Sequence, residues 1–361
     1  MNHRERGLAP FKRLECDRFP MWFGGAPEVS ENIRALLGAR DADEALYDIL
    51  GIDYKTIRPK YNGKPLEKYS DGTWLTEWGI VRGGVHWGQP LTHPLHDAET
   101  VADVEAYEGY PDPDDFITKF TDEQIEWAKG YCLIGGSWSP IFHESVELID
   151  MEEFFVKLYT NPAVCEAVIE RCFSFNYELD RRVFEQNRGL LDMYFIGNDF
   201  GSQRALLMSP DMWREYYKPY IAKLVAQAKS NGCVTAIHSC GDIHEIIGDL
   251  IEIGVDAINP IQVSAANMDP EKLVGEYGGD CVFFGGIDEV KYLQFGTEEE
   301  SRAETRRIID MLGKHGRYIV AASHDYLLPE IPAQNIAAMF DEAKSYGCGA
   351  GAGQPGAREE A

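Results

Sequence analysis

Eight short apolar runs are spaced along the chain, and they alternate with stretches whose apolar residues recur at helical intervals. The runs cover residues 19–23, 54–58, 132–136, 193–197, 234–237, 257–261, 281–285 and 318–322. Helical periodicity is found over 27–37, 151–186, 209–230, 243–253, 298–315 and 333–346. Short apolar runs rich in β-branched and aromatic residues are typical of buried strands. Strands alternating with helices predict a parallel sheet, and its closure into a single (β/α)8 TIM barrel is the simplest α/β arrangement.

Two segments depart from this alternation. The long connection after the second run contains residues 74–81, where apolar and polar side chains alternate, which predicts a small antiparallel hairpin inserted after the second strand. Residues 349–361 are rich in Gly, Ala and charged side chains, which is typical of a disordered tail. We therefore expect one barrel domain over residues 1–348, followed by a tail over 349–361.

Composition narrows the classes of partner. The 361 residues include 34 Lys+Arg and 60 Asp+Glu, a formal net charge of −26, which disfavours binding to nucleic acid or anionic membranes. No apolar run approaches the roughly 18 residues of a membrane span, and the first residues do not resemble a signal peptide. The eight cysteines are scattered without a CxxC pair, which suits a reducing compartment. We expect a cytoplasmic protein.

The most informative candidate site is the pair His238 and Cys240, directly after the apolar run 234–237. An imidazole and a soft thiolate two residues apart at the end of a strand can turn toward one metal ion, and zinc accepts this ligand pair. A buried cysteine beside a hydrogen-bonded core histidine explains the pair equally well. Zinc needs three or four ligands, so the pair alone does not define a metal site.

Other polar and aromatic residues follow the predicted strands, and the C-terminal strand ends of such a barrel form one catalytic face. His324, after the eighth strand, is the best third ligand, although a substrate-binding or acid/base histidine is the alternative. Asp199 is interpreted as a polar anchor for substrate or for a loop. Glu144 becomes a candidate general acid if it is buried, but a solvated loop residue is the alternative. The remaining candidates at these ends are Trp22, Phe23, Arg58, Trp138, Asn259 and Asp288.

Several motifs resemble those of the uroporphyrinogen decarboxylase superfamily. They are Asp-Phe-Gly-Ser-Gln at 199–203, Ile-His-Ser-Cys-Gly-Asp at 237–242, Gly-Val-Asp-Ala-Ile-Asn-Pro at 254–260, Phe-Gly-Gly-Ile-Asp at 284–288, and Ser-His-Asp at 323–325 followed by Pro-Glu-Ile-Pro. The resemblance spans about residues 19–346, nearly the whole chain, and it implies a TIM barrel.

Two branches of that superfamily imply different chemistry. True decarboxylases use no metal and hold the substrate's propionates with arginines after the first strand, but residues 22–28 contain no arginine here. The decarboxylases' tyrosine after the third strand is also missing, and Glu144 falls near that place. The methyltransferases that work with corrinoid proteins bind zinc through a His-x-Cys pair like His238 and Cys240. They usually add a cysteine from the eighth strand, where this chain has His324.

The resemblance therefore implies a zinc-dependent methyltransferase that moves a methyl group between a small methylated substrate, a methoxy or methylamine compound, and a separate corrinoid protein. A metal-free decarboxylase acting on uroporphyrinogen or another carboxylate is the first alternative. A catalytically silent barrel that binds a tetrapyrrole or a metal is the second. A homodimer is a further open expectation.

The leading hypothesis gives each candidate residue a role. Zinc would be held by His238, Cys240 and His324, and would act as a Lewis acid on the heteroatom. Glu144 or Asp199 would manage the proton or orient the substrate. The expected substrate contacts are Trp22, Phe23, Arg58, Trp138, Asn259 and Asp288, of which Trp22, Phe23 and Trp138 would form an apolar wall.

Overall fold

A sheet of seven parallel strands forms the centre of the computed structural model, which describes residues 1–85 and 87–346. The strand order is β1-β7-β8-β9-β10-β11-β12, and every neighbouring pair is parallel. The strands are β1 (Tyr54–Thr56), β7 (Cys132–Gly135), β8 (Met193–Gly197), β9 (Val234–His238), β10 (Ala257–Asn259), β11 (Val282–Phe284) and β12 (Tyr318–Ile319). They coincide with seven of the eight predicted runs.

The first predicted run, residues 19–23, is not a strand in the structure, and Pro20 explains the difference. Proline has no backbone N–H to donate to a strand ladder, so a run that contains it pairs only locally. Met21 nevertheless forms a parallel bridge with Val320, beside β12. The Met21 carbonyl accepts a hydrogen bond from the Asp53 N–H, directly before β1. The segment is thus bonded near both edges of the curled sheet, as in a TIM-barrel-like fold.

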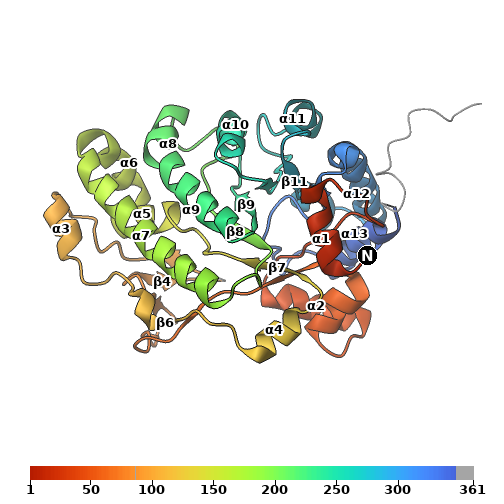
Figure 1. The fold of residues 1–361 in the computed structure, drawn as a ribbon, viewed down its shortest axis with the longest axis horizontal. Coiled ribbons are helices and arrows are strands. Elements are labelled where there is room, and N and C mark those ends of the chain that lie inside the picture. The colour runs from red at the N-terminus through yellow and green to blue at the C-terminus, as the bar shows by residue number, and fades with distance from the viewer. Residues whose placement is uncertain (86, 347–361) are drawn as a thin grey trace, which may run out of the picture.

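Helices surround the sheet and form an arc outside the strands (Figure 1). Local sequence signals explain several starts. A capping box on Thr297 begins α12, and Pro162 occupies the first position of α7. The helices are α1 (His3–Lys12), α2 (Pro27–Leu37), α3 (Val101–Ala106), α4 (Asp122–Ala128), α5 (Phe142–Ile149), α6 (Met151–Thr160), α7 (Pro162–Gln186), α8 (Pro210–Tyr216), α9 (Lys218–Ser230), α10 (His244–Glu252), α11 (Pro270–Tyr277), α12 (Glu298–Leu312) and α13 (Ala333–Tyr346). Short helical turns occur at η1 (Glu44–Leu50), η2 (Pro113–Asp115), η3 (Glu289–Gln294) and η4 (Gly313–His315).

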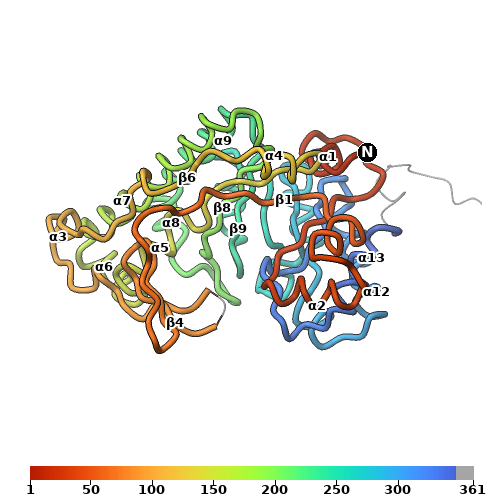
Figure 2. The backbone as a smooth tube through the Cα atoms, turned by 90° about the horizontal axis from the view of Figure 1, so that it is seen from below, coloured from red at the N-terminus to blue at the C-terminus, as the bar shows by residue number. Residues whose placement is uncertain are grey.

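The long connection between β1 and β7 contains two small antiparallel sheets. Strands β3 (Trp74–Leu75), β4 (Val81–Gly83) and β5 (Gln89–Pro90) form one, and β2 (Lys60–Tyr61) pairs with β6 (Phe116–Ile117) in the other. The residues predicted to form a hairpin, 74–81, lie in β3 and at the start of β4. Figure 2 shows β4 and α3 far from α1 and α13. The tail predicted over 349–361 lies outside the described residues.

Alternation of side chains along the strands separates two apolar layers. One layer fills the space enclosed by the strands, and the other packs between the strands and the helices. Phe195 belongs to the inner layer, whereas its neighbours Tyr194 and Ile196 belong to the outer one. The two-residue period of a strand therefore decides which side chains reach the interior. Within residues 1–85 and 87–346, no helix combines the length and apolarity needed to cross a membrane.

Candidate active site

His238 is the central residue of the candidate site, and strand register places it. In β9 it lies two residues after Ala236, which faces the interior, so the imidazole points the same way. Gly197 of β8 and Asn259 of β10 are its register partners. The amide Oδ1 of Asn259 lies 2.8 Å from His238 Nδ1 and accepts its hydrogen. This bond orients the ring and leaves Nε2 available as a ligand.

His238 Nε2 and one atom from each of two other residues form a group of three potential metal ligands. Asp199 Oδ1 lies 3.2 Å away and Cys240 Sγ 3.3 Å away, and the ligand atoms of all three residues lie within 4.8 Å of one another. The backbone N–H of Cys240 also donates to Asp199 Oδ1 at 2.8 Å. Tetrahedral zinc with nitrogen, oxygen and thiolate ligands places such atoms roughly 3.3–3.6 Å apart. The donor set and its spacing therefore fit a zinc ion.

The electrostatic field at this donor group favours a cation. Burial lowers the pKa of His238, but the charge of Asp325 and the contacts with Cys240 and Asp199 outweigh burial and raise the pKa well above its ordinary value. Burial likewise raises the pKa of Asp199, yet contacts with His143 and His238 bring it far below the usual carboxyl range. Two carboxylates and a thiol thus face one buried imidazole, an arrangement that a positive charge at this place would stabilise.

His324, the predicted third ligand, lies beside Cys240 but outside the three-donor group. Its ring centroid is 6.4 Å from that of His238, and its Nδ1 accepts a hydrogen bond from the Tyr326 N–H at 3.1 Å. Burial lowers the pKa of His324, whereas a hydrogen bond with Cys240 and nearby negative charges raise it to about 9. Asp199 is the third residue of the donor group that the structure brings together. Zinc ligation by His324 stays a prediction.

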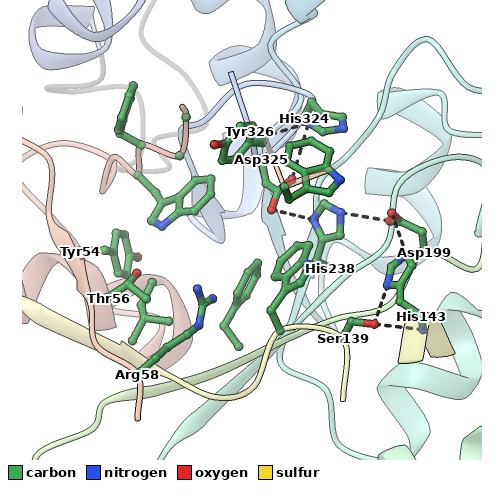
Figure 3. Close-up of a pocket in the computed structure, with 18 of the residues that line it drawn as sticks. Tyr54, Thr56, Arg58, Ser139, His143, Asp199, His238, His324, Asp325 and Tyr326 are labelled. Atoms are coloured by element: carbon green, nitrogen blue, oxygen red, sulfur yellow. Dashed lines mark hydrogen bonds and ion pairs between the residues drawn. The ribbon is translucent and has the colours of Figure 1, made fainter. Parts of the chain in front are cut away.

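Sequence reasoning missed a hydrogen-bonded chain that reaches Asp199 from the end of β7 (Figure 3). Ser139 Oγ lies 2.5 Å from His143 Nδ1, and His143 Nε2 lies 3.5 Å from Asp199 Oδ2. The backbone N–H of His143 also donates to Ser139 Oγ. His143 was visible as a polar residue after the third run, but no local pattern connected it with Asp199. The chain orients the outer carboxylate oxygen of Asp199, while the inner oxygen faces His238.

A pocket of about 660 Å³ opens above the donor group and is walled by aromatic rings. The ring centroid of Trp138 lies 4.9 Å from that of His238 and 6.1 Å from that of Phe195. The ring centroids of Trp22 and Phe195 are 6.2 Å apart. Gly197 makes room for this arrangement, because a Cβ there would meet the Trp138 ring at 2.7 Å. The predicted site residues that line the pocket are Trp22, Phe23, Arg58, Trp138, Glu144, Asp199, His238 and His324.

Three other predicted site residues are not among the described residues that line this pocket. Cys240 lies against His238, as described above. Asn259 is fully buried, and its side chain contacts His238. The Asp288 carboxylate caps the turn η3 by accepting a hydrogen bond from the Lys291 N–H. Direct substrate contacts by Asn259 and Asp288 stay predictions.

Glu144 presents a buried carboxyl oxygen to this region. Its Oε2 has no hydrogen-bond partner among the described residues. Burial is the main cause that raises the pKa of Glu144 well above its ordinary value, and the charge of Glu147 adds to it. This shift favours the protonated carboxyl, the form that can donate a proton to a group in the pocket.

Replacing Glu144 with glutamine is expected to stabilise the fold at pH 7.5 and to have no such effect at pH 4. Because the folded pKa exceeds the unfolded one, the stability cost is absent below about pH 4.5 and grows with pH up to the folded value. Glutamine has no proton to lose and removes that cost. Thermal unfolding should show a gain of at least about 2 °C at pH 7.5. The exposed Glu152→Gln is the control, and an equal gain at both pH values would contradict the expectation.

The fold and the donor group define a class of protein: a TIM-barrel-like α/β protein with a candidate metal site at the C-terminal ends of its strands. The chain matches the family model described as uroporphyrinogen decarboxylase (URO-D) over residues 90–346. It therefore belongs to the uroporphyrinogen decarboxylase family.

Its curated relatives come from both branches expected from the sequence. The methylcobamide:CoM methyltransferase MtbA of Methanosarcina mazei is 24% identical over 221 residues, 61% of this chain and 60% of the relative. MtaA of Methanosarcina barkeri, with the same activity in its name, is 24% identical over 140 residues, 39% and 38% of the two chains. Uroporphyrinogen decarboxylase of Chlorobaculum parvum is 26% identical over 144 residues, 39% of each chain. The matches thus span about 60% or less of these relatives.

A solved structure shows the same fold over almost the whole length. A methyltransferase from Methanosarcina mazei superposes with a TM-score of 0.65 at 15% sequence identity, covering 96% of this chain and 99% of the other. The TIM-barrel-like architecture thus extends beyond the region matched in sequence.

Proposed function

We propose that this protein is a zinc-dependent methyltransferase that moves a methyl group between a small methylated substrate and a separate corrinoid protein. The observation that carries the proposal is the donor group of His238, Cys240 and Asp199 beside an aromatic pocket. A thiolate and an imidazole on one ion form a zinc-type ligand set. The methylcobamide:CoM methyltransferases among its relatives support the reaction class.

Residues of this chain would have distinct roles in the proposed reaction. His238, Cys240 and Asp199 would hold the zinc ion, which supplies Lewis acidity toward the heteroatom of the substrate. Trp138 packs against the His238 ring and, with Trp22, offers apolar surface to a methoxy or aromatic group.

Glu144 is the proposed source of the proton that the methyl transfer requires. Transfer of the methyl group to the partner's corrinoid would break the bond between the methyl carbon and the substrate heteroatom, and the electron pair of that bond would stay on the heteroatom. Glu144, whose pKa is raised by burial and which lines the pocket, would supply the proton that the leaving heteroatom needs. The aromatic walls favour an aryl methyl ether over a methylamine as donor.

Metal-free decarboxylation is the second candidate, favoured by the Chlorobaculum relative. Uroporphyrinogen carries several carboxylates, which require several cationic partners. The pocket offers two arginines, Arg58 and Arg82, and Arg82 is ion-paired with Glu147. The net charge of −26 adds long-range repulsion. This charge pattern supports methyl transfer over decarboxylation.

Paired assays distinguish the two activities. Zinc-loaded protein is incubated with aryl methyl ethers or methylamines and a panel of Co(I) corrinoid proteins, and methylcobalamin formation is followed by its absorption. The same preparation is incubated with uroporphyrinogen, and coproporphyrinogen is measured. We expect methyl transfer and no useful decarboxylation. Robust coproporphyrinogen formation without methyl transfer would reverse the ranking of the two functions.

A further inference from the structure

The pocket holds a guanidinium that forms no ion pair with a described residue. Arg58 follows β1 by two residues, and its side chain points into the pocket (Figure 3). Its Nε donates to the Gly136 carbonyl at 3.2 Å. Among residues 1–85 and 87–346, no carboxylate pairs with it and no acceptor is bonded to Nη1 or Nη2. One edge of the guanidinium is thus anchored, and its two terminal nitrogens are free to bind a ligand.

Arg82 provides the contrast within the same pocket. Its Nη2 forms an ion pair with Glu147, and its Nη1 donates to the Gly88 carbonyl at 3.1 Å. Its charge and donors are therefore already used by the protein. Arg58 is different, since its side chain is exposed within the pocket; the surrounding protein lowers its pKa, and the charge of Asp325 opposes this effect. An accessible guanidinium that forms no ion pair with a described residue leaves its terminal N–H groups open to an anionic ligand.

A series of aromatic rings in the same pocket leads to the donor group. Trp22, Phe195 and Trp138 form a series of rings with centroid separations of 6.2 Å and 6.1 Å, and Trp138 ends 4.9 Å from His238. Such a series suits a flat apolar body, because rings pack face to face or edge to face. The pocket thus combines a free oxyanion anchor, an aromatic surface and a group of metal ligands.

We propose that Arg58 binds the carboxylate of a planar, apolar monocarboxylic acid whose body lies against Trp22, Phe195 and Trp138. The guanidinium fork matches a carboxylate in two parallel hydrogen bonds. Resting on the proposed methyl transfer, this anchor makes the donor an acid whose methylated heteroatom faces His238 and Cys240. Carboxylate binding itself requires neither the corrinoid protein nor turnover.

Binding of benzoate and its neutral isostere benzamide tests the anchor on the full-length zinc-loaded protein. Isothermal titration or quenching of tryptophan fluorescence gives both dissociation constants. We expect benzoate to bind at least about tenfold more tightly than benzamide, the usual scale of one charge-assisted pair. Arg58→Gln should abolish this preference, and Arg58→Lys should retain part of it. Arg82→Gln, the matched control, should preserve it.

Several outcomes would overturn the proposal. Equal affinities for benzoate and benzamide in the unmodified protein, or no binding of either, would show that Arg58 is not a carboxylate anchor. No variant is needed for this conclusion. A benzoate preference that survives Arg58→Gln would place the anion elsewhere. Tighter binding of benzenesulfonate than of benzoate would refute the carboxylate assignment. Zinc content and methyl transfer are measured separately. Loss of the benzoate preference in Arg58→Gln, without methyl transfer by the unmodified protein, would therefore refute the proposed function and leave the anchor intact.

Discussion

Replacing Cys240 with serine is expected to remove both the bound zinc and methyl transfer. The thiolate is the soft ligand of the donor group, and a serine hydroxyl is far harder to deprotonate. His238 Nε2 and Asp199 Oδ1 would remain 3.2 Å apart, but two protein ligands hold zinc weakly. Loss of a partner that only supports a ligand typically costs 10–100-fold in metal affinity, so loss of a ligand should cost more than about 100-fold.

Elemental analysis and competition with a chromophoric chelator measure this loss directly. Cobalt substitution adds a spectroscopic signature, because the thiolate-to-cobalt charge-transfer band should disappear in the variant. Cys16→Ser is the matched control, since Cys16 is also half-buried and free but does not belong to the donor group. Retention of a full equivalent of zinc by Cys240→Ser, with an unchanged cobalt spectrum, would show that the thiolate does not bind the metal.

Replacing Gly241 with alanine is expected to destabilise the fold and to reduce zinc binding. A Cβ at Gly241 would lie 2.4 Å from the carbonyl carbon of Gly201 and 2.6 Å from the Ser202 oxygen, and the residue has φ +83°. These contacts join the loop that follows Asp199 to the loop that carries Cys240. The strained backbone and the overlap should together cost about 2–5 kcal/mol. Separation of the loops should also pull Asp199 away from Cys240.

Gly72→Ala separates the cost of the strained backbone from the cost of the overlap between the two loops. Gly72 has a similar φ of +88°, but a Cβ there would meet no atom within 4 Å. It should therefore show only the backbone cost, on the order of 1 kcal/mol, and retain its zinc. Chemical unfolding and metal content of both variants, prepared together, are the measurements. Equal destabilisation by the two substitutions, with zinc retained in both, would mean that the close approach of the loops is unimportant.

The apolar pattern determined most of the architecture because a strand's burial is a local property. Seven of the eight predicted runs form the parallel sheet, in which interior and exterior positions alternate. The run at 19–23 failed as a strand because Pro20 has no N–H for a ladder, although Met21 still bonds near both sheet edges. The sequence alone also showed that His238 and Cys240 lie close together, since residues two positions apart at the end of one strand are neighbours in any fold.

The third donor was decided by tertiary structure. Asp199 and His324 both follow strands, and the sequence offers no means of measuring which lies nearer to His238 across the barrel mouth. Parallel pairing of β8 with β9 places Gly197 beside His238, and this register brings Asp199 within 3.2 Å of the imidazole. Contact of the Gly201 and Gly241 backbones completes the approach of the two loops.

The sequence also could not show which residues orient His238 and Asp199. Asn259 reads as a polar residue at a strand end, and only strand register shows that it orients His238. The chain from Ser139 through His143 to Asp199 joins residues up to 60 positions apart, where no periodicity operates. Local patterns determined which segments become strands and which face of each is buried. The distances between strand ends, on which coordination and charge balance depend, follow from how the whole sheet curls and pairs.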